Sequence, residues 1–483
     1  MTVADHRAAR TSGTRIRAPL AAALRVASSS PGPLPLTWVS VPMAPFDPID
    51  VFAAAQALDL EAALWLQPAS GRTFVGIGRA WAIEADGPDR FATSARASRD
   101  VLASAVGGND GTTGGPRLLG GLGFTGRRPS LEDPWGPFGP ASLVLPTFTL
   151  ARESDAAEVT IAIAPGRDDD PDPDEVEAAW LEIERRARAA VGSDDAVVSS
   201  NLRVVEERPD RATWERTVGR FAGAVGRGRI DKVVLARRVL LEAPSDFDVV
   251  ATLRRLARSA PESTVFAFVR DGTTFLGATP ERLVHTSGRR FETVAIAGSV
   301  ARGRDDAADD VLARDLLASE KEREEHQVVV DGLRADLAPI VERLEVAPAP
   351  TVLRLRHVQH LATPITGSTR DEMGLLALAG RLHPTPAVGG APRDTALAMI
   401  DEHEGFDRGW YAGPIGWLGA DGDGELMVAL RCALVVGRSA TLFAGCGIVA
   451  DSEPAREWDE SRLKLRTMIE ALGGVEDPAE TST

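Results

Sequence analysis

Apolar and polar positions alternate along much of the first 165 residues, which is the period-two pattern of half-buried β-strands. The pattern predicts strands at 37–43, 63–67, 74–83, 142–150 and 159–164. Short turns separate some of these segments, so we expect antiparallel pairing. An acidic, proline-bearing segment follows at 167–174, and the apolar spacing of 175–191 predicts an amphipathic helix.

The second half of the chain mixes helices with strands. Two hairpins are predicted to turn at Asp271-Gly272 and Ser287-Gly288, because these residue pairs suit tight turns. Helices are predicted at 213–225, 305–344 (with one break), 371–382, 393–404 and 453–472, and strands at 232–241, 411–418, 425–436 and 440–449. Strict alternation of strand and helix is missing, so the pattern favours an α+β layered fold with antiparallel strands.

The chain has 483 residues, of which 44% are hydrophobic, enough for one large domain or two medium ones. A change of composition near residue 200 is a weak boundary signal. Residues 1–30 are rich in Arg, Ala and Ser, a composition that also occurs in transit peptides. We favour a disordered tail there, and a second one at 473–483.

The net charge of −16 at pH 7 opposes binding to nucleic acid or to an anionic membrane, and no basic patch offsets it. No apolar run is long enough to span a bilayer, and the first thirty residues lack the apolar core of a secretory signal. The two cysteines, Cys432 and Cys446, lie in apolar runs and are expected to be buried thiols. We therefore expect a cytoplasmic protein without a nucleic-acid or membrane partner.

Lysine is scarce: only three of the 54 basic residues are lysines, namely Lys232, Lys321 and Lys464. Arginine supplies surface charge equally well, but it cannot lose its proton or present a compact ammonium group. The remaining lysines are therefore candidates for those two tasks. Chance survival at the surface is the alternative for any one of them.

Two pairs of glutamates have helical spacing. Glu322 and Glu325 are three residues apart, as are Glu457 and Glu460, and Lys464 follows four residues later. Each pair would share one face of a helix. If the two pairs faced each other they would form an oxygen-rich site suited to Mg²⁺. Solvated helical faces are the alternative, and the spacing alone favours that interpretation.

Two single residues are candidates for proton transfer. Lys232 begins an apolar strand, where burial could lower its pKa and make it a general base. Glu281 follows a Gly-Ala-Thr-Pro turn at 277–280, where its carboxyl could be held protonated as an acid. Surface charges at strand edges are the ordinary alternative for both.

A third group of residues could bind an anion. Arg431 interrupts an apolar run and needs an anionic partner if it is buried. Gly445 and Gly447 lie at a strand end, where their amides could approach an anion, although a bulge or turn has the same pattern. Tyr411, the only tyrosine, could donate a hydrogen bond or simply pack. His357 and His360 lack the further ligands that a metal site requires.

Several common catalytic motifs are absent: the Walker loop, a strand-linked G-x-G-x-x-G, G-x-S-x-G and H-E-x-x-H. Their absence disfavours nucleotide-binding, serine-hydrolase and zinc-protease functions. The carboxylates and lysines remain as the candidate chemistry.

Taken together, these segments resemble the chorismate-utilising enzymes, a family that includes isochorismate synthases, salicylate synthases and the large subunit of anthranilate synthase. The resemblance rests on Lys-Val-Val-Leu-Ala-Arg (232–237), Gly-Ala-Thr-Pro-Glu (277–281), Ile-Ala-Gly-Ser (296–299), 319–326, Gln-His-Leu-Ala-Thr-Pro (359–364), Leu-His-Pro-Thr-Pro-Ala (382–387), Phe-Asp-Arg (406–408), Leu430-Arg431 and 443–464. All three lysines lie within these blocks. The match is specific over 213–472 and looser over 31–212, where Trp135-Gly-Pro-Phe138 and the strand pattern carry it.

The resemblance implies a single catalytic domain at 31–472, with two large antiparallel β-sheets packed together and helices outside. It also implies a monomer that needs no protein partner. It implies a Mg²⁺ ion held directly by Glu325 and Glu460 and, through waters, by Glu322 and Glu457. The residues that it implies for binding chorismate are Ser299, His360, Tyr411, Leu430, Arg431, Gly445, Gly447 and Lys464.

Family members that use water as the nucleophile carry a lysine at the position of Lys232. The resemblance therefore implies that Lys232 activates water for attack at C2 of chorismate, while Glu281 protonates the departing C4 hydroxyl. The expected product is isochorismate, which feeds menaquinone or siderophore biosynthesis. Salicylate synthase is the main alternative, because Tyr411 and Leu430 are residue types also found in that branch. An ammonia-using synthase component and a non-catalytic regulator are further alternatives.

Overall fold

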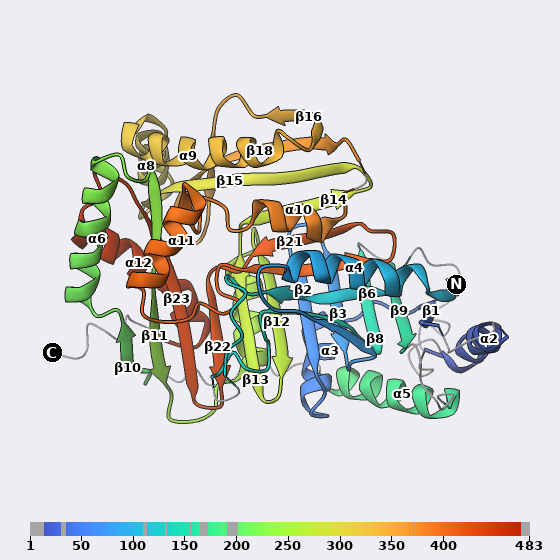
Figure 1. Ribbon diagram of the computed structural model, residues 1–483. Helices are drawn as coiled ribbons and strands as arrows, with labels where there is room; N and C mark the ends of the chain where they lie inside the picture. The colour runs from blue at the N-terminus through green and yellow to red at the C-terminus, as the bar shows by residue number, and fades with distance from the viewer. Residues whose placement is uncertain are drawn as a thin grey trace.

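The computed structural model of the chain describes residues 14–29, 35–109, 114–130, 133–153, 156–164, 172–190, 201–371 and 373–474. Two large β-sheets, of 13 and 10 strands, pack together, and helices lie outside them (Figure 1). Apart from the parallel pair β1 (Thr37–Pro42) and β5 (Val106–Asn109), the paired strands are antiparallel. The predicted fold class is confirmed.

Each sheet contains strands from both halves of the chain. The larger sheet has the order β10 (Arg203–Arg208), β11 (Lys232–Glu242), β23 (Ser439–Ile448), β22 (Cys432–Val436), β13 (Thr273–Thr279), β12 (Thr264–Arg270), β2 (Ala62–Gln67), β3 (Arg72–Ile77), β8 (Phe148–Glu153), β9 (Ala156–Ile163), β1 and β5, with β19 (Gly390–Ala391) beside β11. The smaller sheet has the order β16 (Val341–Val346), β18 (Val358–Thr369), β15 (Arg290–Ala301), β14 (Arg282–Ser287), β21 (Gly424–Val428), β20 (Pro414–Gly419), β6 (Arg117–Leu122), β7 (Ala141–Leu145) and β4 (Trp81–Glu84), with β17 (Thr351–Arg354) beside β18.

The helices flank the two sheets. They are α2 (Arg17–Ser28), α3 (Pro48–Gln56), α4 (Arg90–Ala103), α5 (Pro173–Ala189), α6 (Arg211–Gly226), α7 (Val249–Ser259), α8 (Asp306–Ala318), α9 (Glu320–Leu337), α10 (Leu375–Leu382), α11 (Arg393–His403) and α12 (Pro454–Ala471). Among the residues that the structure describes, none of these helices combines the length and the apolar character required to cross a bilayer.

The alternation of side chains along each strand divides the core into two parts. In β2, Trp65 packs into the core between the two sheets, whereas Leu64 and Leu66 pack into a second core. Side chains of α3, α5, α7 and α12 complete that second core on the outer face of the larger sheet. Because successive strand residues point to opposite faces, a strand buried on both sides is almost entirely apolar.

The chain passes directly from one sheet to the other at four short bends. Two of these bends contain a proline, Pro146 between β7 and β8 and Pro280 between β13 and β14, and one contains Gly78 at a φ of +70°. The fourth lies between β21 and β22. The continuous strands predicted at 74–83, 142–150 and 425–436 are therefore wrong, since each is two strands in different sheets. The apolar pattern continues through each bend because the strands on both sides bury their side chains in the same core. At the bends that contain proline or glycine, the strands end because these residues change the backbone direction.

The helical stretch predicted at 305–344 is two helices followed by a strand. Ser319 ends α8 and begins α9, and its hydroxyl accepts a hydrogen bond from the Glu322 amide at 3.3 Å. The one predicted break is confirmed. The end of the predicted helix is wrong, because residues 341–346 form β16 and pair with β18.

The disordered tail predicted for residues 1–30 is wrong where the structure describes it. Residues 17–28 form α2, and Leu20 and Leu24 are buried in the second core together with Ile16. The backbone amides of Thr14 and Ile16 are bound by Glu184 and Glu177 of α5. The high content of Arg and Ala hid an amphipathic helix. Residues 1–13, 30 and 475–483 of the predicted tails, and residues 167–171 of the acidic segment, lie outside the described residues.

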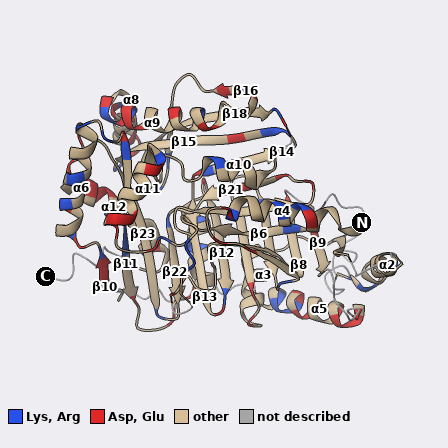
Figure 2. Ribbon diagram, viewed as in Figure 1, with Lys and Arg blue, Asp and Glu red and all other residues tan. Residues whose placement is uncertain are grey.

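Basic and acidic side chains are interspersed along the outer helices. Figure 2 shows both signs on α5 in this view. On α5, Glu182 forms ion pairs with Arg185 and Arg186 at 2.6 and 2.7 Å. Such mixed faces do not offer the single-signed surface that nucleic acid requires.

A candidate active site between the two sheets

Twelve of the fourteen predicted site residues line one cavity between the two sheets. The cavity receives side chains from β11, β15, β18 and β23 and from the helices α9 and α12. Those predicted residues are Lys232, Glu281, Ser299, Glu325, His360, Tyr411, Leu430, Arg431, Gly445, Gly447, Glu460 and Lys464. The structure thus brings together residues that are separated by more than two hundred positions in the sequence.

Lys232 lies at the start of β11 with 1% of its side chain exposed, and its Nζ is 2.9 Å from Oε1 of Glu325 on α9. Strand alternation places Lys232 and Val234 on the same face, and both line the cavity. Of the two alternatives left open for this lysine, burial and a surface position at a strand edge, the structure shows burial. The amine therefore has access to a bound molecule while it remains shielded from bulk water.

Gly447 leaves the space that this ion pair occupies. A Cβ atom at position 447 would lie 2.3 Å from Oε1 of Glu325 and 2.5 Å from Cε of Lys232. At Gly445 a Cβ would lie 3.0 Å from the hydroxyl of Tyr411. Both glycines belong to β23, which pairs with β11 in the register Val234 to Gly447. They permit close approach of side chains across the sheet, which an ordinary strand residue would prevent.

Glu281 follows the bend at Pro280 and is 5% exposed. Burial raises the pKa of its carboxyl to about 7, although the charges of Lys232, Lys464 and Arg431 lower it in part. The carboxyl thus keeps its proton near neutral pH. A buried carboxyl with such a pKa can donate a proton to a leaving group.

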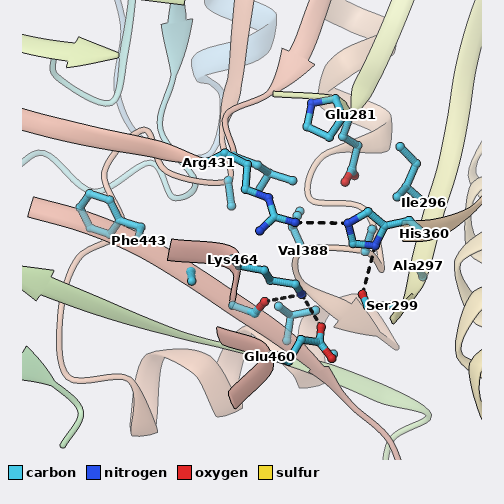
Figure 3. Close-up of a pocket in the computed structure, with 18 of the residues that line it drawn as sticks. Glu281, Ile296, Ala297, Ser299, His360, Val388, Arg431, Phe443, Glu460 and Lys464 are labelled. Atoms are coloured by element: carbon cyan, nitrogen blue, oxygen red, sulfur yellow. Dashed lines mark hydrogen bonds and ion pairs between the residues drawn. The ribbon is translucent and has the colours of Figure 1, made fainter. Parts of the chain in front are cut away.

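Arg431 has the unusual φ of +48° at the bend between β21 and β22. Its Nη2 lies 3.2 Å from Nε2 of His360, whose Nδ1 lies 3.1 Å from the Gly298 carbonyl and 3.0 Å from the Ser299 hydroxyl (Figure 3). A carbonyl only accepts hydrogen bonds, so Nδ1 carries the ring proton and Nε2 accepts from Arg431.

Burial is the main cause that lowers the pKa of His360 to about 3, and the positive charge of Arg431 adds to it. The imidazole is therefore neutral. Nη1 of Arg431 is buried and has no partner among the described residues. An unpaired buried donor of this kind is a ready ligand for an anion.

Tyr411 stacks on Phe443, with ring centroids 5.2 Å apart and an interplanar angle of 14°. It precedes β20, and it is buried. Burial raises the pKa of its phenol above the usual range, so the group keeps its proton. It can therefore act as a hydrogen-bond donor within the cavity.

Lys464 of α12 lies near two oxygen atoms of the site. Its Nζ donates to the Gly445 carbonyl at 2.9 Å and lies 2.6 Å from Oε1 of Glu460 (Figure 3). Burial opposes the charged form, but the Glu460 carboxylate outweighs it and raises the pKa of Lys464 above its usual range. The ammonium is therefore permanently charged and can attract a substrate carboxylate.

The two remaining predicted residues, Glu322 and Glu457, lie outside the cavity lining. Oε2 of Glu322 accepts a hydrogen bond from the Ser299 amide at 2.9 Å. Oε1 of Glu457 lies 3.5 Å from Nζ of Lys321. Burial and then the nearby Glu460 raise the pKa of Glu457 to about 7. Glu322 shares α9 with Glu325, and Glu457 shares α12 with Glu460. In each pair the second glutamate lines the cavity and the first does not.

This set of carboxylates has the chemistry of a Mg²⁺ site. Ligand atoms of Glu457, Glu460 and Cys446 converge within 4.8 Å of one another. Burial raises the pKa of the Cys446 thiol well above its usual value, so this sulfur stays protonated and the carboxylates are the available ligands. Mg²⁺ prefers one or two carboxylates and retains waters, and carboxylates behind the direct ligands can hold those waters. Glu457 and Glu460 therefore fit such an ion, whereas Glu325, predicted as a direct ligand, is outside this converging group and pairs with Lys232.

Arg408 is a cavity residue that was not among the predicted site residues. Its guanidinium pairs with Glu404 and donates to the carbonyls of Val234 and Val388 at 2.9 and 2.8 Å. Glu404 in turn accepts from the Ala236 amide at 2.8 Å. The Arg408–Glu404 pair therefore binds β11 through the Val234 carbonyl and the Ala236 amide. The Phe-Asp-Arg block at 406–408 could have identified Arg408 as a site residue, because an arginine beside an apolar segment requires a buried partner.

A family model for the chorismate binding enzymes matches residues 24–473. The chain belongs to the chorismate-binding enzyme family. It is 39% identical over 442 residues to a salicylate biosynthesis isochorismate synthase of Pseudomonas aeruginosa, covering 91% of this chain and 90% of that protein. It is 35% identical over 364 residues to the isochorismate synthase MenF of Bacillus subtilis, with 74% and 75% covered.

Solved structures of chorismate-binding enzymes have the same fold. The menaquinone-specific isochorismate synthase MenF of Escherichia coli superposes with a TM-score of 0.72 at 27% identity, covering 94% of this chain and 100% of that one. Anthranilate synthase component I of Streptococcus pneumoniae superposes with a TM-score of 0.64 at 22% identity, covering 84% and 89%. The second similarity extends to the fold alone.

Proposed function

We propose that this chorismate-binding enzyme is an isochorismate synthase that converts chorismate to isochorismate with Mg²⁺ as its cofactor. The observation that carries the proposal is the pairing of groups in one cavity: the buried amine of Lys232 and the Glu281 carboxyl, with its pKa of about 7. A reaction that adds water to one ring carbon and expels hydroxyl from another needs a base and an acid at separate positions.

Lys232 would act as the base. It takes a proton from a water molecule as the oxygen of that water forms a bond to C2 of chorismate. The two ring double bonds shift, and the bond from C4 to its hydroxyl breaks. Glu281 donates its proton to this hydroxyl, which leaves as water, so one water enters and one leaves. Proton transfer back from Lys232 to Glu281 through solvent then restores both groups.

Cationic groups and hydrogen-bond donors would hold the dianionic substrate. We assign the enolpyruvyl carboxylate to Arg431, Tyr411 and the amides of Gly445 and Gly447, because Nη1 of Arg431 is an unpaired buried donor beside them. Ser299, His360 and Leu430 form the remaining wall. His360 fixes the guanidinium, and fixed donors lose little entropy when the substrate binds.

Glu325 and Glu460 would hold Mg²⁺ directly, and Glu322 and Glu457 would hold its waters. When bound, the ion supplies positive charge that offsets the ring carboxylate of the substrate. Lys464 adds a second positive charge on the same side. Orientation and charge should therefore contribute to the rate together with proton transfer.

Incubation of the purified protein with chorismate, with Mg²⁺ or with EDTA, tests the proposal when the products are resolved by chromatography. We expect isochorismate only in the presence of the ion. Equimolar salicylate and pyruvate would instead identify a salicylate synthase, which forms the same intermediate and then eliminates pyruvate. Ammonia-dependent formation of an aminated product would identify an amidotransferase component.

A further inference from the structure

All three lysines of the chain lie against the same four glutamates. Lys232 pairs with Glu325 and Lys464 pairs with Glu460, at 2.9 and 2.6 Å. Both of these lysines line the cavity and have proposed roles in binding or catalysis. The third lysine, Lys321, does not line the cavity, and the proposed reaction assigns it no task.

Lys321 lies in the first turn of α9, between the two carboxylates behind the metal ligands. Its Nζ is 3.5 Å from Oε1 of Glu457 on α12 and 3.8 Å from Oε1 of Glu322 on its own helix. Its side chain is 32% exposed, whereas that of Glu457 is 4% exposed. Lys321 is thus the ammonium that links the two helices on the outer side of the cluster.

We propose that Lys321 is the resident counter-cation of the metal site: it keeps the four glutamates assembled without metal and weakens the intrinsic binding of Mg²⁺. The inference rests on the proposed metal site, and it makes Lys321 a positioning residue. A positive charge so close to the ligands of a divalent cation repels that cation. The same charge stabilises the empty site, because four adjacent carboxylates otherwise repel one another.

The charges indicate why such a counter-cation is useful. With all four glutamates ionised and all three lysines protonated, as they are before Lys232 gives up its proton to act as a base, the cluster has one net negative charge. Addition of Mg²⁺ makes it positive, and the dianionic substrate makes it negative again. A site with this balance binds the ion weakly by itself and firmly when the substrate is present. Without Lys321 the cluster has two net negative charges and retains the ion regardless of substrate.

Two substitutions separate charge from packing. Lys321→Met removes the ammonium and keeps much of the apolar stem, whereas Lys321→Arg keeps the charge. Arg466→Met is the control, because it removes one cation from the other helix, α12, where Arg466 pairs with Glu470 at 2.9 Å. The full-length protein is used for each variant, after metal has been removed with EDTA and the chelator has been washed out.

The first measurement is calorimetric titration with MgCl₂ at pH 8.5. We expect Lys321→Met to lower the Kd for Mg²⁺ about tenfold relative to wild type. Lys321→Arg and Arg466→Met should stay within about twofold. In a Glu281→Gln background, which slows turnover, chorismate should tighten Mg²⁺ binding more when Lys321 is present than when Met replaces it.

The second measurement is the Tm of each metal-free protein and its increase with saturating Mg²⁺. Lys321→Met should have a lower metal-free Tm than wild type and a larger increase with Mg²⁺. Equal or weaker Mg²⁺ binding by Lys321→Met would overturn the proposal, as would an unchanged metal-free Tm. If wild type itself binds no Mg²⁺, the metal site fails, while the metal-free Tm still tests the counter-cation role.

Discussion

Nζ of Lys232 lies 2.9 Å from Oε1 of Glu325, so the proposed base and a proposed metal ligand are direct neighbours. The two residues come from β11 and α9, which belong to different layers of the fold. Removal of the charge from either residue therefore leaves the charge of the other without its partner. Several predictions about the site depend on this and similar contacts.

Replacement of Lys232 by Met should abolish the addition of water, because Lys464, the other amine that lines the cavity, is held by Glu460 and the Gly445 carbonyl. The loss in kcat should be at least about 10² to 10⁴-fold, the usual contribution of a general base. Chorismate binding, measured by calorimetry, should change by less than about tenfold. Turnover close to that of wild type would show that another group activates the water.

The rate should fall as the pH rises through about 7, because Glu281 must be protonated to act as an acid. Burial raises the pKa of this carboxyl to about 7, so the active form dominates below that pH and is lost above it. The measurement is the pH profile of kcat/KM from pH 5.5 to 9, because this ratio reports the ionisations of the free enzyme. Glu281→Gln should lose about 10² to 10⁴-fold in kcat and should lack this alkaline decline. An unchanged decline in that variant would assign it to another group.

Glu281→Gln should also stabilise the folded protein at alkaline pH. A carboxyl whose folded pKa lies above its unfolded value stabilises the fold below the unfolded pKa, and this contribution is lost as the pH rises to the folded pKa. The unfolded value is about 4.3, so the loss extends from there to about pH 7. The variant should therefore gain Tm relative to wild type at pH 8 and not at pH 4. A gain of equal size at both pH values would show that the effect is unrelated to ionisation.

Gly447→Ala should inactivate the enzyme, because its Cβ would lie 2.3 Å from Oε1 of Glu325 and would displace the Lys232 pair. Gly219→Ala is the matched control, since that glycine lies in α6 with no atom within 4 Å of an added Cβ. The control should keep full activity and gain up to about 1 kcal/mol of stability. Comparable activity of the two variants would contradict the proposed tight packing.

Arg431→Lys should raise KM for chorismate by roughly 10- to 100-fold, because lysine keeps the charge but cannot donate to His360 and to a carboxylate in one fixed plane. His360→Asn tests the same arrangement from the other side. It should raise KM by a smaller factor and leave the pH profile of kcat unchanged, because neutral His360 transfers no proton in the proposed reaction. A new ionisation in that profile would give His360 a direct role.

The local sequence was sufficient for the helices that carry the glutamates and for the antiparallel character of the sheets. A spacing of three residues places Glu322 with Glu325, and Glu457 with Glu460, because a helix repeats every 3.6 residues. The turn at Asp271-Gly272 was likewise readable, and both residues have a positive φ. The bends between strands could not be predicted, because one continuous strand and two short strands in different sheets have the same apolar pattern.

The sequence by itself was enough to predict twelve of the residues that line the cavity, and the scarcity of lysine drew attention to Lys232 and Lys464 among them. Their partners were decided only by the tertiary structure. Lys232 meets Glu325, and Lys321 meets Glu457, across elements that are far apart along the chain. Periodicity reports contacts within one turn or one pleat, whereas these ion pairs form because two sheets and two helices pack around one cavity.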